Sequence, residues 1–288
     1  MFLKKNYKNF YNSFNKALLS KKGIIAPGCG DPLSAKLIQK KKFKFIFIGG
    51  FALSSSQYGY PDAGLITLSE LVDAAKKIQN SVNIPCIVDA DTGFGGVVNV
   101  HRTVRDLANL GVAALTIEDQ QFPKKCALTK EVKILDFNDA CQRIKVAVNA
   151  AKINKKKDIG IIARTDAYSL FGIEEAAKRI KIYKSLGADA VFVTGINTKE
   201  DLIKISKYKN LNLMINIHPK IKFKIDDLKK YGIKIAIYSQ SILNGYIDST
   251  NFVLEKIKNG SIPKSKNLSK NTLDLLDFKK FLQIEKNS

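Results

Sequence analysis

Two aspartates stand one residue apart at the end of an apolar run, in the stretch VDADTGFGG (88–96). Side chains two positions apart on a strand share a face, so Asp89 and Asp91 are expected to point the same way. Glu118, which ends the next apolar run, would add a third carboxylate. Such a set of oxygen ligands suits Mg²⁺ or Mn²⁺ better than zinc. The alternative is a set of carboxylates that Arg164 and nearby lysines balance without a metal.

Further groups that could bind an anion also follow apolar runs. Arg164, in ARTD, could hold a substrate carboxylate through paired hydrogen bonds. Its alternative role is an ion pair with Asp166 or Glu118, and both roles are compatible. The backbone N–H groups of Gly49 and Gly50 could bind a second carboxylate, although a glycine pair alone more often marks a turn.

One cysteine lies in a segment that could reach the same site. The stretch EDQQFPKKCALTKE (118–131) places Cys126 directly after Lys124 and Lys125. Neighbouring ammonium groups favour a thiolate, which makes this cysteine a credible acid–base group. A lone cysteine is otherwise usually inert. The glycines of GFGG (93–96) do not match a phosphate-binding loop and predict a tight bend after the strand.

Alternating patterns along the chain predict the elements that position these groups. Short apolar runs, read as strands, cover 24–28, 43–50, 85–91, 113–119, 159–166, 189–195, 212–217 and 234–239. Helical patterns between and after them cover 32–40, 68–81, 98–110, 137–153, 173–186, 198–208, 224–231 and 241–258.

This alternation predicts an α/β fold, a (β/α)8 TIM-type barrel, with a doubly wound open sheet as the alternative. We expect a single domain with an N-terminal helix (1–23), the barrel (24–258) and a C-terminal helical extension (259–288). In a barrel the carboxyl ends of the strands share one face, so the polar groups above should converge there. Phe10, Phe14 and Leu18 would form the apolar face of the first helix.

The composition indicates which partners and which cellular compartment to expect. The net charge is +22, but only five of the 48 basic residues are arginine and the lysines are spread along the whole chain, which favours a solvated surface over nucleic-acid binding. Four widely spaced cysteines predict free thiols in a cytoplasmic protein. No apolar stretch approaches the length of a membrane span or signal peptide, so we expect no membrane partner.

The chain resembles the isocitrate lyase and phosphoenolpyruvate mutase superfamily, which includes methylisocitrate lyase. The resemblance is carried, in order, by APGCGDPLSAKL (26–37), GG…GYPDAGLIT (49–67), VDADTGFGG (88–96), IEDQ..PKKC (117–126) and ARTDA (163–167). The combination is specific, whereas no single motif would be.

The resemblance implies an Mg²⁺-dependent enzyme that acts on small 2-oxo or 2-hydroxy carboxylates through an enolate-like intermediate. Asp91 would hold the metal most directly, and Asp89 and Glu118 would act largely through its waters. The other implied site residues are Gly49, Gly50, Phe51 and Arg164 for the substrate carboxylate, Asn216 and Thr194 for the rest of the substrate, and Asp62, Lys124, Cys126 and Arg164 for catalysis.

Cys126 takes the position from which family lyases protonate the carbanion left by C–C cleavage, whereas mutases and phosphonopyruvate hydrolases carry asparagine there. The chain departs from the lyases at Leu128, Thr194 and Asn244, which favours a substrate smaller than a tricarboxylic acid. A P–C bond enzyme and an inactive barrel that binds an anionic partner remain alternatives. The resemblance also implies a homotetramer in which C-terminal helices are exchanged between neighbours.

Overall fold

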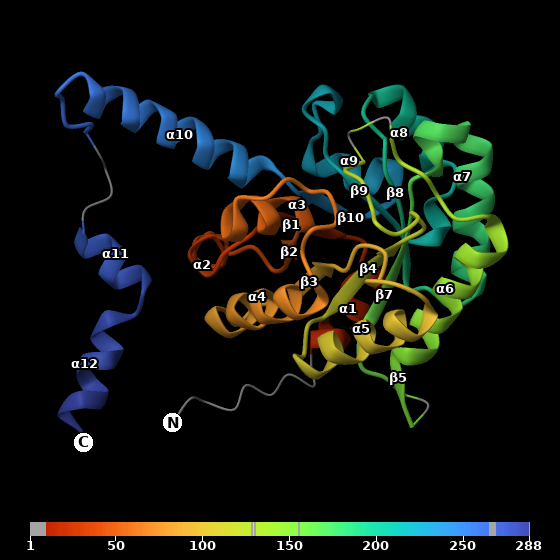
Figure 1. Cartoon of the computed structure of the whole chain (residues 1–288), viewed down its shortest axis with the longest axis horizontal. Coiled ribbons are helices and arrows are strands. Elements are labelled where there is room, and N and C mark those ends of the chain that lie inside the picture. The colour runs from red at the N-terminus through yellow and green to blue at the C-terminus, as the bar shows by residue number, and fades with distance from the viewer. Residues whose placement is uncertain (1–9, 128, 130, 155, 265–268, 288) are drawn as a thin grey trace.

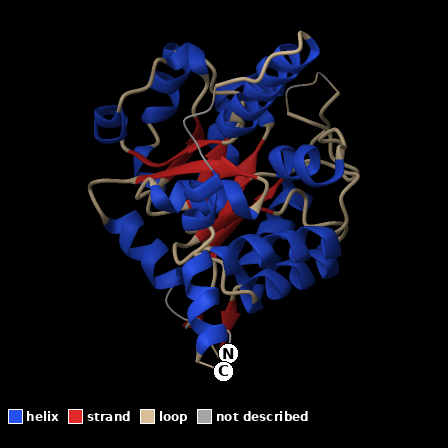
Figure 2. Cartoon of the chain, turned by 90° about the vertical axis from the view of Figure 1, so that its left-hand side faces the viewer, coloured by secondary structure: helices blue, strands red, loops and turns tan. Residues whose placement is uncertain are grey.

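Eight parallel strands close into a barrel with helices around it (Figures 1 and 2). The computed structural model describes residues 10–127, 129, 131–154, 156–264 and 269–287. The barrel strands are β1 (Ile24–Cys29), β2 (Ile46–Ile48), β3 (Cys86–Asp89), β4 (Ala114–Glu118), β7 (Gly160–Thr165), β8 (Ala190–Val193), β9 (Leu213–Asn216) and β10 (Ile233–Tyr238). Their order around the barrel follows the chain, and β10 pairs in parallel with β1. The predicted TIM-type barrel is therefore confirmed, and the open sheet is excluded.

A helix follows each strand, and the helices between successive strands cover the outside of the barrel. They are α2 (Pro32–Lys40), α4 (Leu68–Ser81), α5 (Val97–Asn109), α6 (Phe137–Ala150), α7 (Ala167–Ser185), α8 (Lys199–Ser206), α9 (Ile225–Tyr231) and α10 (Ser241–Lys258). The start of α4 shows why these segments are helical. Thr67 accepts a hydrogen bond from the backbone of Glu70, and Glu70 accepts one from the backbone of Thr67.

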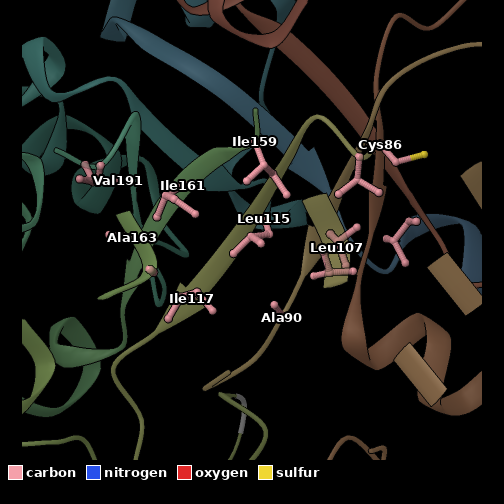
Figure 3. Close-up of a cluster of buried hydrophobic side chains, with 14 of the residues drawn as sticks. Cys86, Ala90, Leu107, Leu115, Ile117, Ile159, Ile161, Ala163 and Val191 are labelled. Atoms are coloured by element: carbon pink, nitrogen blue, oxygen red, sulfur yellow. The ribbon is translucent and has the colours of Figure 1, made fainter. Parts of the chain in front are cut away.

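Alternate residues of each strand belong to two separate apolar cores. Cys86, Val88 and Ala90 face the helices, in the outer cluster of Figure 3 that includes Leu115 and Ile117 of the next strand. The intervening residues fill the inside of the barrel, where the inner cluster contains Ile87, Ala114, Ile162, Phe192, Met214 and Ile237. The period of two along a strand therefore decides which side chains can reach the interior.

The N-terminal helix α1 (Phe10–Leu19) packs against the inner cluster. Phe14 and Leu18 are buried in it and Phe10 packs against its edge, as their spacing predicts. Gly160, the first residue of β7, makes room for Phe14, because a Cβ at this glycine would lie 2.5 Å from the phenyl ring. The helix thus covers the end of the barrel at which the strands begin.

Three local features differ from the expectation. The strand predicted at 43–50 is shorter in the structure, where it is β2. Helix α3 (Gly50–Leu53) and a π-helical turn (Ser54–Tyr58) follow it closely. The helix expected at 173–186 begins at Ala167 and contains a non-helical residue, Gly172. A small antiparallel hairpin, β5 (Lys152–Ile153) with β6 (Lys156–Lys157), extends beyond α6.

The C-terminal helices begin against the barrel and then extend beyond it. In Figure 1, α10 extends away from the strands, and α11 (Ser269–Leu275) and α12 (Phe278–Lys286) follow at one side of the molecule. An ion pair of 3.2 Å joins Asp277, between these two helices, to Lys36 of α2. Large apolar side chains on this arm are exposed, among them Phe252, Ile257, Phe278 and Phe281.

Candidate active site

The carboxyl ends of the strands bring the predicted site residues together. Asp89, Glu118 and Arg164 continue the inward-facing positions of Ile87, Ala114 and Ile162, each two or four residues further along its strand. The same alternation continues inward from Phe192 to Thr194, from Met214 to Asn216 and from Ile237 to Ser239. The apolar interior of the barrel is thus replaced by polar side chains at one end.

A cavity of about 380 Å³ opens at this end. Nine of the predicted site residues line it, namely Gly49, Gly50, Phe51, Asp62, Asp89, Cys126, Arg164, Thr194 and Asn216. The other three, Asp91, Glu118 and Lys124, are buried, and they contact Asp89, Arg164 and Asp62 of this set, respectively. Every site residue predicted from the sequence therefore lies at or beside one cavity.

Lys124 joins two carboxylates from different loops. Its Nζ lies 2.5 Å from Asp62 Oδ1 and 2.6 Å from Asp91 Oδ1. Burial lowers the pKa of Lys124, but the carboxylates of Asp91 and Asp62 outweigh it and hold that pKa well above its usual value. Lys124 is therefore a cation at neutral pH.

Lys124 only partly stabilises the charged form of Asp91. Burial raises the pKa of Asp91 to about 6, Lys124 opposes the rise, and the neighbouring Asp89 and Asp62 add to it. Its backbone is also unusual, with a φ of 49°, which a non-glycine residue adopts rarely. A costly backbone and an incompletely balanced carboxylate at one residue are typical of a functional position.

Arg164 is surrounded by carboxylates. Its Nε and Nη2 each donate to Asp166 at 3.0 Å, and its Nη1 lies 2.9 Å from Glu118 Oε2 and 3.6 Å from Asp89 Oδ2. Its guanidinium also lies over the ring of Phe192, at 5.6 Å from the ring centre. The ion pairs weighed as an alternative for Arg164 are therefore both present, while Arg164 still lines the cavity.

The donors fit a hard divalent cation. Among the described residues no three His, Cys, Asp or Glu side chains form a ready-made metal-binding group, because Lys124 and Arg164 lie among the carboxylates. Glu118 is nevertheless fully buried, and neither of its carboxylate oxygens accepts a well-formed hydrogen bond. Burial raises the pKa of Glu118 well above its usual range, against the effect of Arg164. Arg164 and Lys124 do not fully offset the burial of Glu118 and Asp91, and a bound cation would add the remaining positive charge.

Glycine is required at Gly50 and in the GFGG stretch for two different structural reasons. A Cβ at Gly50 would lie 3.2 Å from Asp91 Oδ1 and 3.4 Å from Lys124 Nζ, so only glycine leaves this side of the charged cluster open. Gly93 and Gly95 have φ values of 84° and 141°, which side chains rarely allow. The GFGG stretch is therefore the tight bend that the sequence predicts, and α5 begins directly after it.

Cys126 lies in the loop between β4 and α6, half-buried at the cavity wall. Lys124, two residues earlier, directs its ammonium group to Asp62 and Asp91, and Lys125 is exposed. Of the three positions at which the chain departs from the lyases, Thr194 and Asn244 line the cavity. Leu128 lies outside the described residues.

The structure adds residues to which the sequence analysis gave no role. The carboxylate of Asp166 receives hydrogen bonds from Gln120 and Thr194 besides Arg164, and its backbone N–H donates to Asp119 at 3.1 Å. Ser239, at the end of β10, donates through its hydroxyl to Asn216 Oδ1 at 3.0 Å. The inward period of two could have identified Ser239, whereas the partners of Asp166 depend on a loop that carries no periodic pattern.

Comparison with known proteins places these features in a family context. The sequence pattern of the phosphoenolpyruvate phosphomutase family matches residues 14–258. A 2,3-dimethylmalate lyase of Eubacterium barkeri is 37% identical over 225 residues, which cover 77% of this chain and 76% of the relative. A 2-methylisocitrate lyase of Aeropyrum pernix is 35% identical, over 84% of this chain and 78% of the relative. An oxaloacetate decarboxylase of Rhodopseudomonas palustris is 30% identical, over 87% and 86%.

Solved structures show the same architecture. A crystal structure of 2,3-dimethylmalate lyase superposes with a TM-score of 0.89 at 29% identity and covers 96% of this chain and 95% of that one. A phosphonopyruvate hydrolase in complex with oxalate and Mg²⁺ superposes with a TM-score of 0.86 at 26% identity, over 96% and 98% of the two chains. The likeness extends over nearly the whole length in both cases.

Proposed function

Because the chain belongs to the phosphoenolpyruvate mutase and isocitrate lyase superfamily, we propose that it is a carbon–carbon bond lyase for a small 2-hydroxy or 2-oxo carboxylate. The observation that supports this proposal is the shared cavity, whose lining includes Cys126, Arg164, Asp62, Gly49 and Gly50. The substrate class agrees with the relatives named as dimethylmalate lyase, methylisocitrate lyase and oxaloacetate decarboxylase.

Substrate binding would begin with its carboxylate. Arg164 offers a guanidinium whose plane is fixed by Asp166, and the backbone at Gly49 and Gly50 lies at the same cavity. The ring of Phe51 and the amide of Asn216 also line the cavity, and Asn216 would orient the remaining part of the substrate. Because Arg164 and Lys124 are already paired with acidic groups, the site favours a small acid over a tricarboxylic one.

Bond cleavage would then follow from groups of this chain. With a 2-hydroxy acid, Asp62 would accept the hydroxyl proton, the C2–C3 bond would break, and its electron pair would pass to C3 as an enolate of the adjacent carboxylate. The Cys126 thiol donates a proton to that carbon, which gives a 2-oxo acid and a second carboxylic acid. With a 2-oxo acid that loses CO₂, the same thiol protonates the enolate.

We propose that Asp91, Asp89 and Glu118 hold Mg²⁺, with Mn²⁺ as an alternative. When bound, the ion supplies positive charge that stabilises a developing enolate. The solved phosphonopyruvate hydrolase with oxalate and Mg²⁺ supports this assignment, as do the raised pKa values of Asp91 and Glu118 in the structure. The four cysteines are free thiols, which suits the reducing cytoplasm in which we propose that the enzyme works.

A mass-spectrometric screen of small 2-oxo acids, 2-hydroxy acids and phosphonates with Mg²⁺ tests the proposal. We expect turnover of a carboxylic acid, a loss of roughly a hundredfold or more in Cys126→Ser, and a comparable loss in Asp91→Ala. Cys141→Ser is the matched control, since Cys141 is also a partly buried free thiol but lies in α6, outside the cavity. Absence of turnover, or full activity of Asp91→Ala, would contradict the proposal.

The screen also separates the rival chemistry. Turnover of phosphonopyruvate with no effect of Cys126→Ser would indicate P–C bond chemistry instead.

A further inference from the structure

Gln120 is a buried amide whose two ends bind different parts of the site. It is 1% exposed and belongs to the stretch that leaves β4. Its Nε2 donates to Asp166 Oδ2 at 2.5 Å, and its Oε1 accepts from the backbone N–H of Lys125 at 2.9 Å. One side chain therefore bridges the end of β7 and the loop that carries Cys126.

The first end leads to the substrate clamp. Asp166 Oδ2 accepts from Gln120 and from Arg164 Nη2, the latter at 3.0 Å. Oδ1 of the same carboxylate accepts from Arg164 Nε at 3.0 Å and from the Thr194 hydroxyl. Two parallel bonds fix the plane of a guanidinium. The hydrogen bond from Gln120 therefore holds the carboxylate that orients Arg164.

The second end leads to the catalytic loop. Lys125 immediately precedes Cys126, and its side chain is exposed. The base of the loop is fixed elsewhere, since Arg143 donates to the carbonyls of Glu118 and Gln120 at 2.8 and 2.6 Å and Arg179 donates to that of Leu135 at 3.0 Å. The bond from Gln120 thus acts on the part of the loop that borders the cavity.

We propose that Gln120 is a positioning residue that couples the placement of the Cys126 loop to the orientation of Arg164. The inference rests on the proposed function to the extent that Arg164 holds the substrate carboxylate. In this arrangement a carboxylate bound at Arg164 strengthens the contact of the loop, and a loop held in place fixes Arg164 for the carboxylate. Such a coupling is reciprocal by thermodynamic necessity.

Two variants separate the ends of the amide. Gln120→Met keeps the length of the side chain but removes both hydrogen bonds. Gln120→Glu keeps an acceptor for the Lys125 N–H but turns a carboxylate towards Asp166. Gln121→Met is the matched control, because Gln121 is the adjacent glutamine, is exposed and donates to the Ile134 carbonyl at 3.2 Å.

The probe is oxalate with Mg²⁺, measured by calorimetry, together with hydrogen exchange of segment 121–127. In the parent and in Gln121→Met we expect oxalate to slow exchange of this segment. In Gln120→Met the Kd for oxalate should rise roughly tenfold or more, as expected for a lost hydrogen bond to a charged group, and the slowing should disappear. In Gln120→Glu the Kd should rise while the segment of the free protein remains as protected as in the parent.

A purely structural role would give a different result. If Gln120→Met lowers the melting temperature but leaves the Kd for oxalate and the oxalate-dependent slowing unchanged, the coupling is disproved. Failure of the proposed function alone would give another result. Oxalate would still bind in a Gln120-dependent way, while no acid in the screen is turned over.

If oxalate does not bind the parent, Arg164 is not a carboxylate clamp and the inference falls with it. In an active parent, a KM and kcat unchanged by Gln120→Met would likewise overturn it.

Discussion

Asp91 combines a positive φ, nearly complete burial and a carboxylate that one ammonium group only partly balances. The cluster to which it belongs contains two cations, Lys124 and Arg164, and five carboxylates, those of Asp62, Asp89, Asp91, Glu118 and Asp166. This excess of negative charge destabilises the protein unless a proton or a metal ion reduces it. The behaviour of the site should therefore depend on both.

The pKa of Asp91 leads to a prediction about pH. Because this pKa is about 6 in the folded protein against 3.8 for an ordinary aspartate, the folded state binds the proton more tightly than the unfolded chain. The contribution of Asp91 should therefore lower the free energy of unfolding as the pH rises from about 4 to about 6. Denaturant titrations in a chelator at pH 4.5 and 7.5 measure it, and Asp91→Asn should lose less stability over this range than the parent.

Mg²⁺ should reverse that loss. A metal ion competes with the proton on Asp91, so the rise in melting temperature that Mg²⁺ produces should be larger at pH 8 than at pH 5. Thermal unfolding with and without Mg²⁺ at the two pH values measures this difference. Asp91→Asn, which carries no charge at this position, should show a small rise at both. An equal, large rise in the variant would place the metal elsewhere.

Helix α3 brings its backbone close to the charged cluster at Gly50. Gly50→Ala would put a methyl group 3.2 Å from Asp91 Oδ1, so we expect turnover to fall at least tenfold while the circular dichroism spectrum stays that of the parent. Gly245→Ala in α10 is the control, because a Cβ there meets nothing within 4 Å. That change should leave turnover intact and add up to about 1 kcal/mol of stability. Normal turnover in Gly50→Ala would mean that α3 does not limit the site.

Helix α1 stabilises the opposite end of the barrel. Phe14 is fully buried against Gly160, whereas Leu19 of the same helix is 77% exposed. We therefore expect Phe14→Ala to cost about 3 to 5 kcal/mol in the free energy of unfolding, and Leu19→Ala to cost far less. Denaturant unfolding of the two variants measures these costs. Equal losses in the free energy of unfolding would show that α1 does not pack as described.

The regular elements could be predicted because their periods are strong, and the local exceptions could not. The strands of the barrel each carry an apolar run, and helices 32–40, 68–81 and 241–258 have the predicted bounds. Segment 50–58 lacks any period, so its helical turns were missed, and Gly172 interrupts the pattern that would have placed the start of α7.

The same limit applies to the candidate site, where periodic positions could be predicted and loop contacts could not. Residues on strand ends follow from the period of two. The bond between Lys124 and Asp62 joins positions 62 residues apart, and it depends on loops whose paths no sequence pattern specifies. The sequence could therefore indicate which side chains converge, but not that Lys124 would occupy the space between two of the carboxylates.

On the scale of the whole molecule, the C-terminal arm exposes large apolar side chains. Phe278, Phe281 and Ile284 of α12 are exposed, as are Phe252 and Ile257 of α10, and exposed apolar side chains that gather on a surface commonly mark protein contacts. We propose that these helices pack on neighbouring subunits of a homotetramer. Phe281→Glu should shift the mass measured by light scattering to smaller species, whereas Lys279→Glu, on the same helix, should not.

The alternation of inner and outer side chains has a consequence for how this barrel can change. Asn216 ends β9, and Thr194 and Ser239 directly follow β8 and β10, each two residues beyond an apolar residue of the inner cluster. Replacing any of them alters what the cavity contacts without disturbing either core. Inserting one residue within a strand would instead turn every later side chain to the other face. Exchange of single side chains at these positions can therefore change the substrate preference of the barrel. An insertion within a strand would also disturb the two apolar cores.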